Sequence, residues 1–127
     1  MSERLIGRKD GAIGWVIFNN PERRNAVSLD MWQAVPQILG DFEKDPAVRV
    51  VVLAGAGDKA FISGADISQF EKQRSGKESV QRYEDISEAA LAKLAGFGKP
   101  VVAMIRGYCL GAGVNVANVC DLRIAAD

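Results

Sequence analysis

Three closely spaced glycines, Gly107, Gly111 and Gly113, limit the possible folds of this chain more than any other segment. They follow the apolar, β-branched run 101–105, which predicts a buried strand, and they introduce the small apolar residues 112–120, which predict a buried helix. Glycine allows sharp turns and a close approach to the backbone. A strand that enters a helix through such a turn leaves unpaired N–H groups, which suit a phosphate or a developing oxyanion.

The rest of the chain alternates between predicted strands and helices. Trp32, Val35, Leu39 and Phe42 recur on one helical face, so the helix that begins after the N-cap Ser28 is expected to pack on a core. The expected elements are strands at 5–8, 12–19, 48–54, 101–105 and 121–125, and helices from 28 onward, at 79–97 and at 112–120. This order predicts an α/β fold with a largely parallel sheet, flanking helices, and the run from 48 to 54 as a central strand.

Three segments carry further local expectations. Pro36 lies inside the first helical pattern and is expected to kink that helix. Residues 71–78 are polar and include Gly76, which predicts a flexible surface loop. Residues 55–60 match the first half of a dinucleotide fingerprint, G-x-G-x-x-A, which admits a Rossmann domain. Because residues 61–64 interrupt the helix that this fingerprint requires, a turn is the favoured interpretation.

Composition excludes several kinds of active site. The 127 residues include no histidine, which rules out Ser-His-Asp and Cys-His nucleophile pairs and any imidazole-based zinc site. The 16 basic and 16 acidic residues balance, so charge gives no argument for binding nucleic acid or an acidic membrane. Without a membrane span or a targeting segment, the chain is expected to be soluble and cytoplasmic. Cys109 and Cys120 lie among apolar residues, which favours reduced, packed thiols over a disulfide.

A second glycine-containing turn lies upstream. Phe61 and Ile62 precede Gly64, and residues 65–67 are expected to begin a short helical turn. Taken alone, this segment is an ordinary loop with a capping aspartate. Together with residues 111–113 it supplies two turns that can each present a backbone N–H, and two convergent donors are what a thioester oxygen needs when it becomes an enolate oxyanion.

These motifs resemble a known family. The segments Gly-Tyr-Cys-Leu-Gly-Ala-Gly at 107–113 and Cys-Asp-Leu-Arg-Ile-Ala-Ala-Asp at 120–127 are similar to the second oxyanion-hole segment of the enoyl-CoA hydratase/isomerase (crotonase) superfamily. The similarity continues upstream at 24–27 and 61–67. It implies a crotonase-like ββα superhelix, of which residues 1–127 are the N-terminal portion of a single domain and the C-terminal part is absent. It also implies a homo-oligomer, a trimer or hexamer in the family.

The resemblance assigns roles to individual residues. It implies that the backbone N–H groups of Ala65 and Ala112 form the oxyanion hole, and that a coenzyme A thioester is the substrate, with no separate cofactor and no metal. Ala65 to Ser68 would lie against the adenine end, and Arg24 to Ala26 would line the pantetheine and phosphate path. The implied binding residues are Arg24, Asn25, Ala26, Ala65, Asp66, Ile67, Ser68, Gly111 and Ala112.

Asn115 departs from the hydratase pattern, in which a glutamate occupies this position. An amide holds a water or a carbonyl by hydrogen bonds but transfers no proton at neutral pH. Asn115 and Asn118 are therefore either substrate-facing groups or two buried amides that satisfy each other. The first hypothesis is an acyl-CoA enzyme of hydratase or isomerase type. The alternative is a non-catalytic acyl-CoA-binding or assembly module, in which a half-fold exposes apolar faces to a partner.

Overall fold

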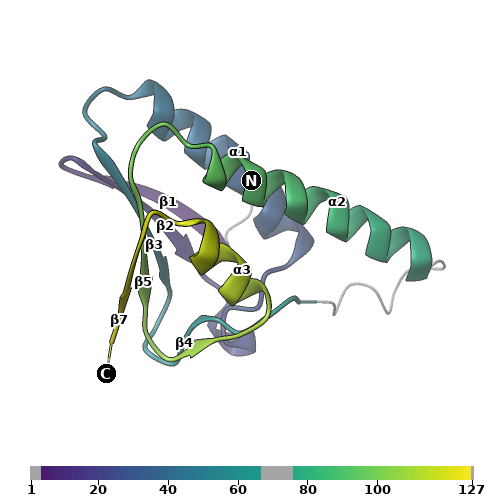
Figure 1. Ribbon diagram of the computed structural model, residues 1–127. Coiled ribbons are helices and arrows are strands. Elements are labelled where there is room, and N and C mark those ends of the chain that lie inside the picture. The colour runs from purple at the N-terminus through teal and green to yellow at the C-terminus, as the bar shows by residue number, and fades with distance from the viewer. Residues whose placement is uncertain (1–3, 67–75, 127) are drawn as a thin grey trace.

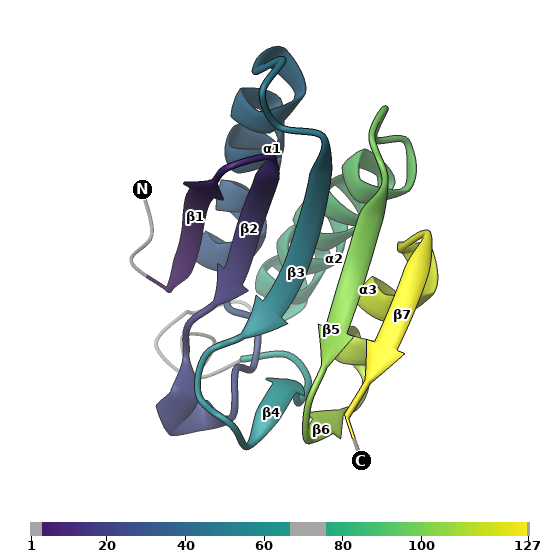
Figure 2. The same ribbon diagram turned by 90° about the vertical axis from the view of Figure 1, so that its left-hand side faces the viewer.

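A five-stranded sheet forms the centre of the computed structural model, and its helices lie on one face of that sheet (Figures 1 and 2). The structure describes residues 4–66 and 76–126. The elements are β1 (Leu5–Asp10), β2 (Ile13–Phe18), the short 3₁₀ helix η1 (Pro21–Arg23), α1 (Leu29–Lys44), β3 (Val50–Gly55), β4 (Ala60–Ile62), α2 (Gly76–Ala95), β5 (Val101–Ile105), β6 (Tyr108–Cys109), α3 (Ala112–Val119) and β7 (Leu122–Ala125). The α/β class expected from the sequence is confirmed.

The sheet has the order β1-β2-β3-β5-β7, with β3 at its centre as predicted. β1 and β2 form an antiparallel hairpin, whereas β2, β3, β5 and β7 run parallel to one another. Val51 and Leu53 of β3 are buried because the helices cover the face toward which they point. A second, two-stranded sheet pairs β4 with β6 in parallel. The sequence pattern did not predict these strands, which are only three and two residues long.

Helix α1 begins where the sequence predicts, after the N-cap Ser28. It continues through Pro36 for 16 residues, so the proline does not end it. The predicted apolar face is buried, with Trp32 and Phe42 at 1% and 3% exposure. Burial of such side chains stabilises by about 1.5–3 kcal/mol each, which outweighs the cost of about 3 kcal/mol for an interior proline.

Two helix predictions need correction. α2 begins at Gly76 and ends at Ala95, so residues 76–78 of the predicted loop are helical, while 71–75 lie outside the described residues. Lys77 and Glu78 are good helix formers, and an acidic residue in the first turn complements the helix dipole. α3 was expected to be buried, but only its Gly113–Val116–Ala117 side is covered. It packs on β4, β6 and α2 from that side, and its other side faces outward.

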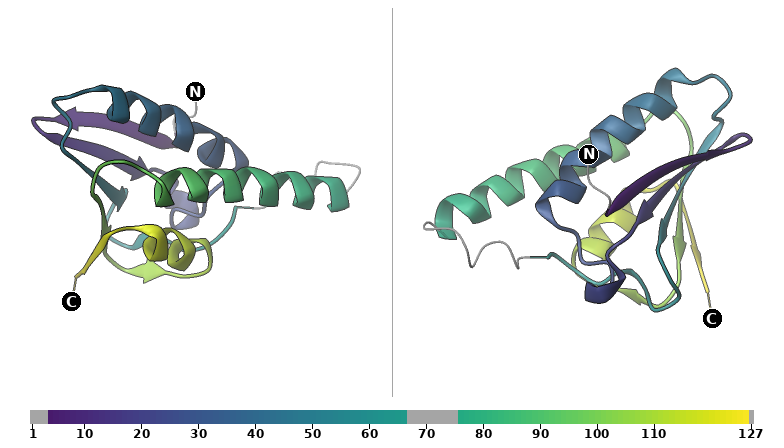
Figure 3. Two further views of the ribbon diagram at one scale, coloured as in Figure 1. Left: turned by 45° about the horizontal axis from the view of Figure 1, so that its top comes forward. Right: turned by 180° about the vertical axis from the view of Figure 1, so that it is seen from behind.

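Helices α1 and α2 pack against each other and cross the same face of the sheet (Figure 3). Among the residues that the structure describes, no helix lies on the opposite face (Figure 2). Apolar side chains are exposed on it and at its edge: Met104 is 41% exposed, and Leu122 and Ile124 of β7 are 60% and 61% exposed. The strand β7 was correctly located from the sequence, but it is covered on neither side. Within the described residues, no helix is both long enough and apolar enough to cross a membrane.

Candidate functional site

The small sheet brings the two glycine-containing turns together. Tyr108 pairs with Ala60 and Cys109 with Ile62, so the segments that follow β4 and β6 leave the sheet side by side. The N–H of Leu110 also donates to the carbonyl oxygen of Ile62 at 3.0 Å. A Cβ placed on Gly111 would lie 3.6 Å from the Cα of Gly64. The juxtaposition expected from the two motifs is therefore present.

Backbone geometry at the start of α3 depends on two glycines. Gly111 has φ of 50° and ψ of −112°, a conformation that favours glycine, and it turns the chain from β6 into α3. Ala112 is the first helical residue, so its N–H has no intrahelical acceptor. A Cβ on Gly113 would lie 2.3 Å from the carbonyl oxygen of Ile62, so glycine is required for α3 to pack this closely on β4. Together these features start α3 close to β4 and to the turn that follows it.

Ala65 is held by a backbone bridge rather than by the predicted helical turn. It forms an isolated parallel bridge with Val27, whose N–H donates to Gly64 O at 2.9 Å and whose carbonyl accepts from Asp66 N–H at 2.9 Å. In this arrangement the peptide groups on either side of Ala65 bond to Val27, and the Ala65 N–H points away. No described residue accepts a hydrogen bond from the N–H of Ala65 or Ala112.

The turn at residues 20–26, which precedes α1, leads directly into Val27 of this bridge. Arg24 and Asn25 both have positive φ, 50° and 59°. Arg24 is exposed, and its guanidinium carbon lies 5.4 Å from the ring centroid of Tyr108, a cation–π contact. Its carbonyl also accepts from the N–H of Ser63 at 3.2 Å. Arg24 thus joins the turn to both of the glycine-containing segments.

Asn25 is 1% exposed, and its amide bonds internally. Its Nδ2 donates to the carbonyl oxygens of Ala56 and Ala60 at 3.0 and 2.8 Å, and its Oδ1 accepts from Asn20 N–H at 2.9 Å. Ala26 is likewise buried, at 8% exposure. The side chains of these two predicted ligand-lining residues therefore face the protein interior and brace the turn.

Asp66 is also turned inward, at 5% exposure. Its carboxylate accepts a hydrogen bond from Asn20 Nδ2 at 3.1 Å and lies 3.7 Å from Arg23 Nε and 4.0 Å from Arg4 Nη1. A buried carboxylate of this kind is compensated by its cationic and amide partners. The contacts tie the segment after β4 to the turn at 20–23. The predicted residues Ile67 and Ser68 lie outside the described residues.

Asn115 and Asn118 are both exposed on α3, so the interpretation as two buried amides is wrong. The Asn115 N–H donates to Gly111 O at 3.2 Å, which is an ordinary first-turn bond of the helix. Its side chain lies one turn beyond Ala112, on a surface that the described residues leave open. This position gives it access to anything bound at the start of α3.

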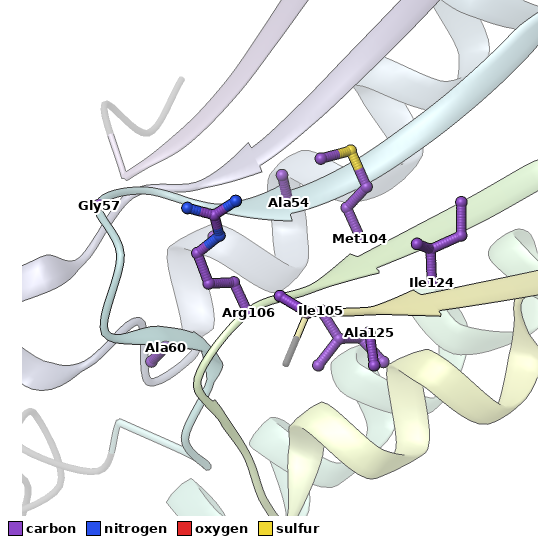
Figure 4. A pocket seen from close by; sticks show the side chains of 10 residues that line it. Ala54, Gly57, Ala60, Met104, Ile105, Arg106, Ile124 and Ala125 are labelled. Carbon is purple, nitrogen blue, oxygen red and sulfur yellow. The ribbon is translucent and has the colours of Figure 1, made fainter.

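Two cavities lie near the turn between β3 and β4, and both are lined by Gly57 and Ala60. One, of ≈ 220 Å³, is bordered by Arg24, Lys59 and Asp58. The other, of ≈ 310 Å³, opens on the uncovered sheet face, where Ala54, Met104 and Ile124 line it and Arg106 extends across it (Figure 4). None of the residues to which the family resemblance assigns a role in binding or catalysis lines this larger cavity. The smaller one contains Arg24 and Asn25 and adjoins the paired turns.

The turn itself excludes the dinucleotide interpretation. A Cβ on Gly55 would lie 2.2 Å from Ala60 O, because the chain folds straight back from β3 into β4. A strand, not a phosphate-binding helix, follows the glycines. No group of three or more potential metal ligands occurs among the described residues. Cys109 and Cys120 are free, as expected, and burial raises the pKa of both thiols, that of Cys120 to about 11.

Sequence reasoning missed one polar residue that the structure connects to this region. Tyr83 lies in α2, within the helix expected at 79–97, and its hydroxyl donates to the carbonyl oxygen of Val27 at 2.5 Å. It also accepts from Trp32 Nε1–H at 2.6 Å. Burial raises its pKa to about 12, so the phenol is neutral at physiological pH. The sequence gives one indication of this contact. Trp32 and Tyr83 lie in two predicted helices, and a buried tyrosine or tryptophan needs a hydrogen-bond partner for its O–H or N–H group.

Comparison with known proteins places this arrangement in a family. The family model for enoyl-CoA hydratase/isomerase matches residues 8–127. The chain is 33% identical to a short-chain-enoyl-CoA hydratase of Clostridium acetobutylicum, over 96% of this chain and 46% of that protein. It is 38% identical to a hydroxycinnamoyl-CoA hydratase-lyase of Pseudomonas fluorescens, over 94% and 44% of the two chains.

A solved structure shows the same fold. An enoyl-CoA hydratase/carnithine racemase from Magnetospirillum magneticum superimposes with a TM-score of 0.89 at 35% identity, covering 98% of this chain and 47% of that one. The chain therefore spans about half the length of the curated relatives that it matches. Because the family model matches residues 8–127 and the fold is shared with a solved member, the chain belongs to the enoyl-CoA hydratase/isomerase (crotonase) family.

Proposed function

We propose that the chain supplies the oxyanion-stabilising part of an enzyme that acts on acyl-CoA thioesters. The observation that carries the proposal is the approach of Gly64 to Gly111, because each of these glycines directly precedes a residue, Ala65 or Ala112, whose N–H bonds to no described residue. Two amides directed at one thioester oxygen stabilise the negative charge that develops when the neighbouring carbon loses a proton. Loss of one such donor typically costs about 3 kcal/mol of transition-state stabilisation in a dry site.

In this proposal the chain binds its substrate through the coenzyme A part. The exposed Arg24 and Lys59 border the ≈ 220 Å³ cavity beside the paired turns, where two cations favour phosphate groups. Asn25, Ala26 and Asp66 support this surface from within, since their side chains are buried. Their contribution to binding would therefore come from the backbone and from the shape that they impose. The relatives named for CoA thioesters support the same substrate class.

Asn115 sets the expected type of reaction. Its amide can hold a water molecule or a carbonyl group beside Ala112, but it transfers no proton at neutral pH. Among the residues described, proton transfer would have to come from a carboxylate, a lysine, a tyrosine or a thiol, because the chain has no histidine. Hydration by two glutamates is thus disfavoured, and a shift of a double bond or another enolate reaction is favoured.

The test compares two ligands by calorimetric titration of the chain. Acetoacetyl-CoA has an enolisable thioester, whereas an S-alkyl-CoA thioether has the same nucleotide and pantetheine but no carbonyl oxygen. The proposal expects saturable binding of both and tighter binding of acetoacetyl-CoA. Equal affinity for the two ligands would refute the oxyanion role, and failure of both to bind a folded, monodisperse sample would refute the acyl-CoA surface itself.

The uncovered sheet face favours a second candidate, a non-catalytic acyl-CoA-binding or assembly module. Leu122 and Ile124 are both at least 60% exposed, and apolar patches of this kind mark interaction surfaces. Sedimentation of the chain separates the candidates when combined with the titration. Self-association together with no thioester preference would support the assembly module. A monomer that prefers the thioester would count against it.

A further inference from the structure

The Tyr83 hydroxyl joins three segments that are far apart in sequence. It accepts a hydrogen bond from Trp32 Nε1–H of α1 at 2.6 Å and donates one to the carbonyl oxygen of Val27 at 2.5 Å. Trp32 and Val27 are 1% and 0% exposed, so both bonds lie against the core. These two hydrogen bonds fix α1, α2 and Val27 relative to one another.

Val27 is the backbone partner of Ala65. Its N–H donates to Gly64 O and its carbonyl accepts from Asp66 N–H, both at 2.9 Å. The Val27 carbonyl oxygen therefore receives two donors, the Tyr83 hydroxyl and the Asp66 amide, which occupy both of its lone pairs. The Gly64 carbonyl and the Ala65 N–H belong to one planar peptide group, so a displacement of Val27 would also turn the Ala65 N–H.

A phenylalanine at position 83 would fill nearly the same volume, so packing alone does not require the hydroxyl. Without the hydroxyl, the indole N–H of Trp32 loses its acceptor, and buried polar groups that lack partners are costly. The phenol is a reliable donor because burial raises its pKa to about 12. It therefore holds the Val27 carbonyl throughout the neutral pH range.

We propose that Tyr83 is a positioning residue for the oxyanion site: its hydroxyl holds Val27 in place, and Val27, which bonds the peptide groups on both sides of Ala65, fixes the direction of the Ala65 N–H. The inference rests on the proposed function and extends it to a residue outside the family motifs. Tyr83 acts through Val27 and contacts no part of the substrate in this account. Its removal should weaken the interaction with the thioester oxygen and leave the coenzyme A contacts intact.

The test is Tyr83→Phe, titrated with acetoacetyl-CoA and with the S-alkyl-CoA thioether. The ratio of the two affinities isolates the carbonyl oxygen from the nucleotide and pantetheine. Loss of a hydrogen bond worth about 1 kcal/mol corresponds to about a fivefold fall in this ratio, with thioether affinity unchanged. The ultraviolet absorbance of the bound acetoacetyl-CoA enolate should fall in parallel, which a purely structural role would not produce.

Two control variants separate positioning from general loosening. Leu94→Val shortens a side chain that is 2% exposed on the same helix, without touching the Tyr83 bonds. Trp32→Phe removes the bond to Tyr83 but leaves the bond from Tyr83 to Val27. Both variants should lower the thermal midpoint and keep the affinity ratio of the wild type. A fall of the ratio in either control as large as in Tyr83→Phe would overturn the proposal.

The outcomes for the two proposals are distinct. If the wild-type chain shows no preference for the thioester, the proposed function is wrong and the role of Tyr83 falls with it. If the wild-type chain shows the preference and Tyr83→Phe retains it in full, only the role of Tyr83 is wrong. A selective loss in Tyr83→Phe, with both controls unaffected, supports the two together.

Discussion

The Asn25→Asp substitution tests how the turn beneath the candidate site is held. Asn25 is 1% exposed, and its Nδ2 donates to Ala56 O at 3.0 Å and to Ala60 O at 2.8 Å. Aspartate has the same shape and also tolerates the positive φ of 59° at this position, so backbone strain is not a confounding factor. The substitution replaces a donor by an oxygen that faces two carbonyl oxygens.

The expected destabilisation follows from these contacts. Two lost hydrogen bonds cost about 1 kcal/mol each, and a buried carboxylate without a cationic partner adds at least about 1–3 kcal/mol. We therefore expect the free energy of unfolding at pH 7 to fall by at least about 3 kcal/mol, a large part of the 5–15 kcal/mol that is typical of a domain. Burial also raises the folded-state pKa of the new carboxyl above its unfolded value, so the deficit should shrink as pH falls.

Urea denaturation at pH 7 and pH 5, followed by circular dichroism, measures both effects. Asn118→Asp is the matched control, since Asn118 is exposed on α3 and should change stability by no more than about 0.5 kcal/mol. A loss of under about 1 kcal/mol for Asn25→Asp at pH 7 would contradict the reasoning. It would show that the Asn25 amide does not brace the turn.

Three further predictions concern packing and pH. Gly113→Ala places a methyl group 2.3 Å from Ile62 O, so it should cost roughly 1–3 kcal/mol by overpacking in the same denaturation assay, and an unchanged midpoint would contradict the close packing of α3. Lys99 Nζ donates to two carbonyl oxygens at the end of α1, at 2.6 and 2.8 Å, so Lys99→Met should cost about 1 kcal/mol; a thermal midpoint equal to that of wild type would argue against this cap. Tyr83 and Cys120 have raised pKa values, about 12 and about 11, so the unfolded chain loses these protons first and stability should fall as pH rises from about 9 to 12. Tyr83→Phe should reduce the loss of stability at the upper end of this pH range by about 1 kcal/mol, a value lowered to allow for the partial exposure of the side chain. A pH profile of the variant identical to that of the wild type would refute the raised pKa of Tyr83.

Periodicity and glycine placement were sufficient to predict most of the architecture. The strands β2, β3, β5 and β7 and the start of α1 lie where alternation, β-branched runs and an N-cap indicated, because these signals are local. β4 and β6 were not predicted, since strands of three and two residues form only through their pairing with each other. α2 begins earlier than the sequence pattern predicts, because Lys77 and Glu78 are polar but also have a high helix propensity.

Burial was harder to predict than secondary structure. Asn25 carries no sequence signal for burial, because its partners Ala56 and Ala60 lie 31 and 35 residues away. The apolar sequences of α3 and β7 indicate that these elements need covering, but they do not indicate what covers them. The two glycine turns before Ala65 and Ala112 are recognisable in the sequence and lie close together in the structure, whereas the inward side chains of Asn25 and Asp66 were not predicted.

The most direct test of the account is Ala112→Pro. Proline is favoured at the first position of a helix, so this variant removes the Ala112 N–H while α3 is preserved. A hydrogen bond to a charged oxygen contributes about 1.5–3 kcal/mol, so the preference of the chain for acetoacetyl-CoA over the S-alkyl-CoA thioether should fall about tenfold or more. Affinity for the thioether should stay the same. A folded Ala112→Pro variant that keeps the full preference of the wild type would contradict the claim that this amide stabilises the enolate oxygen.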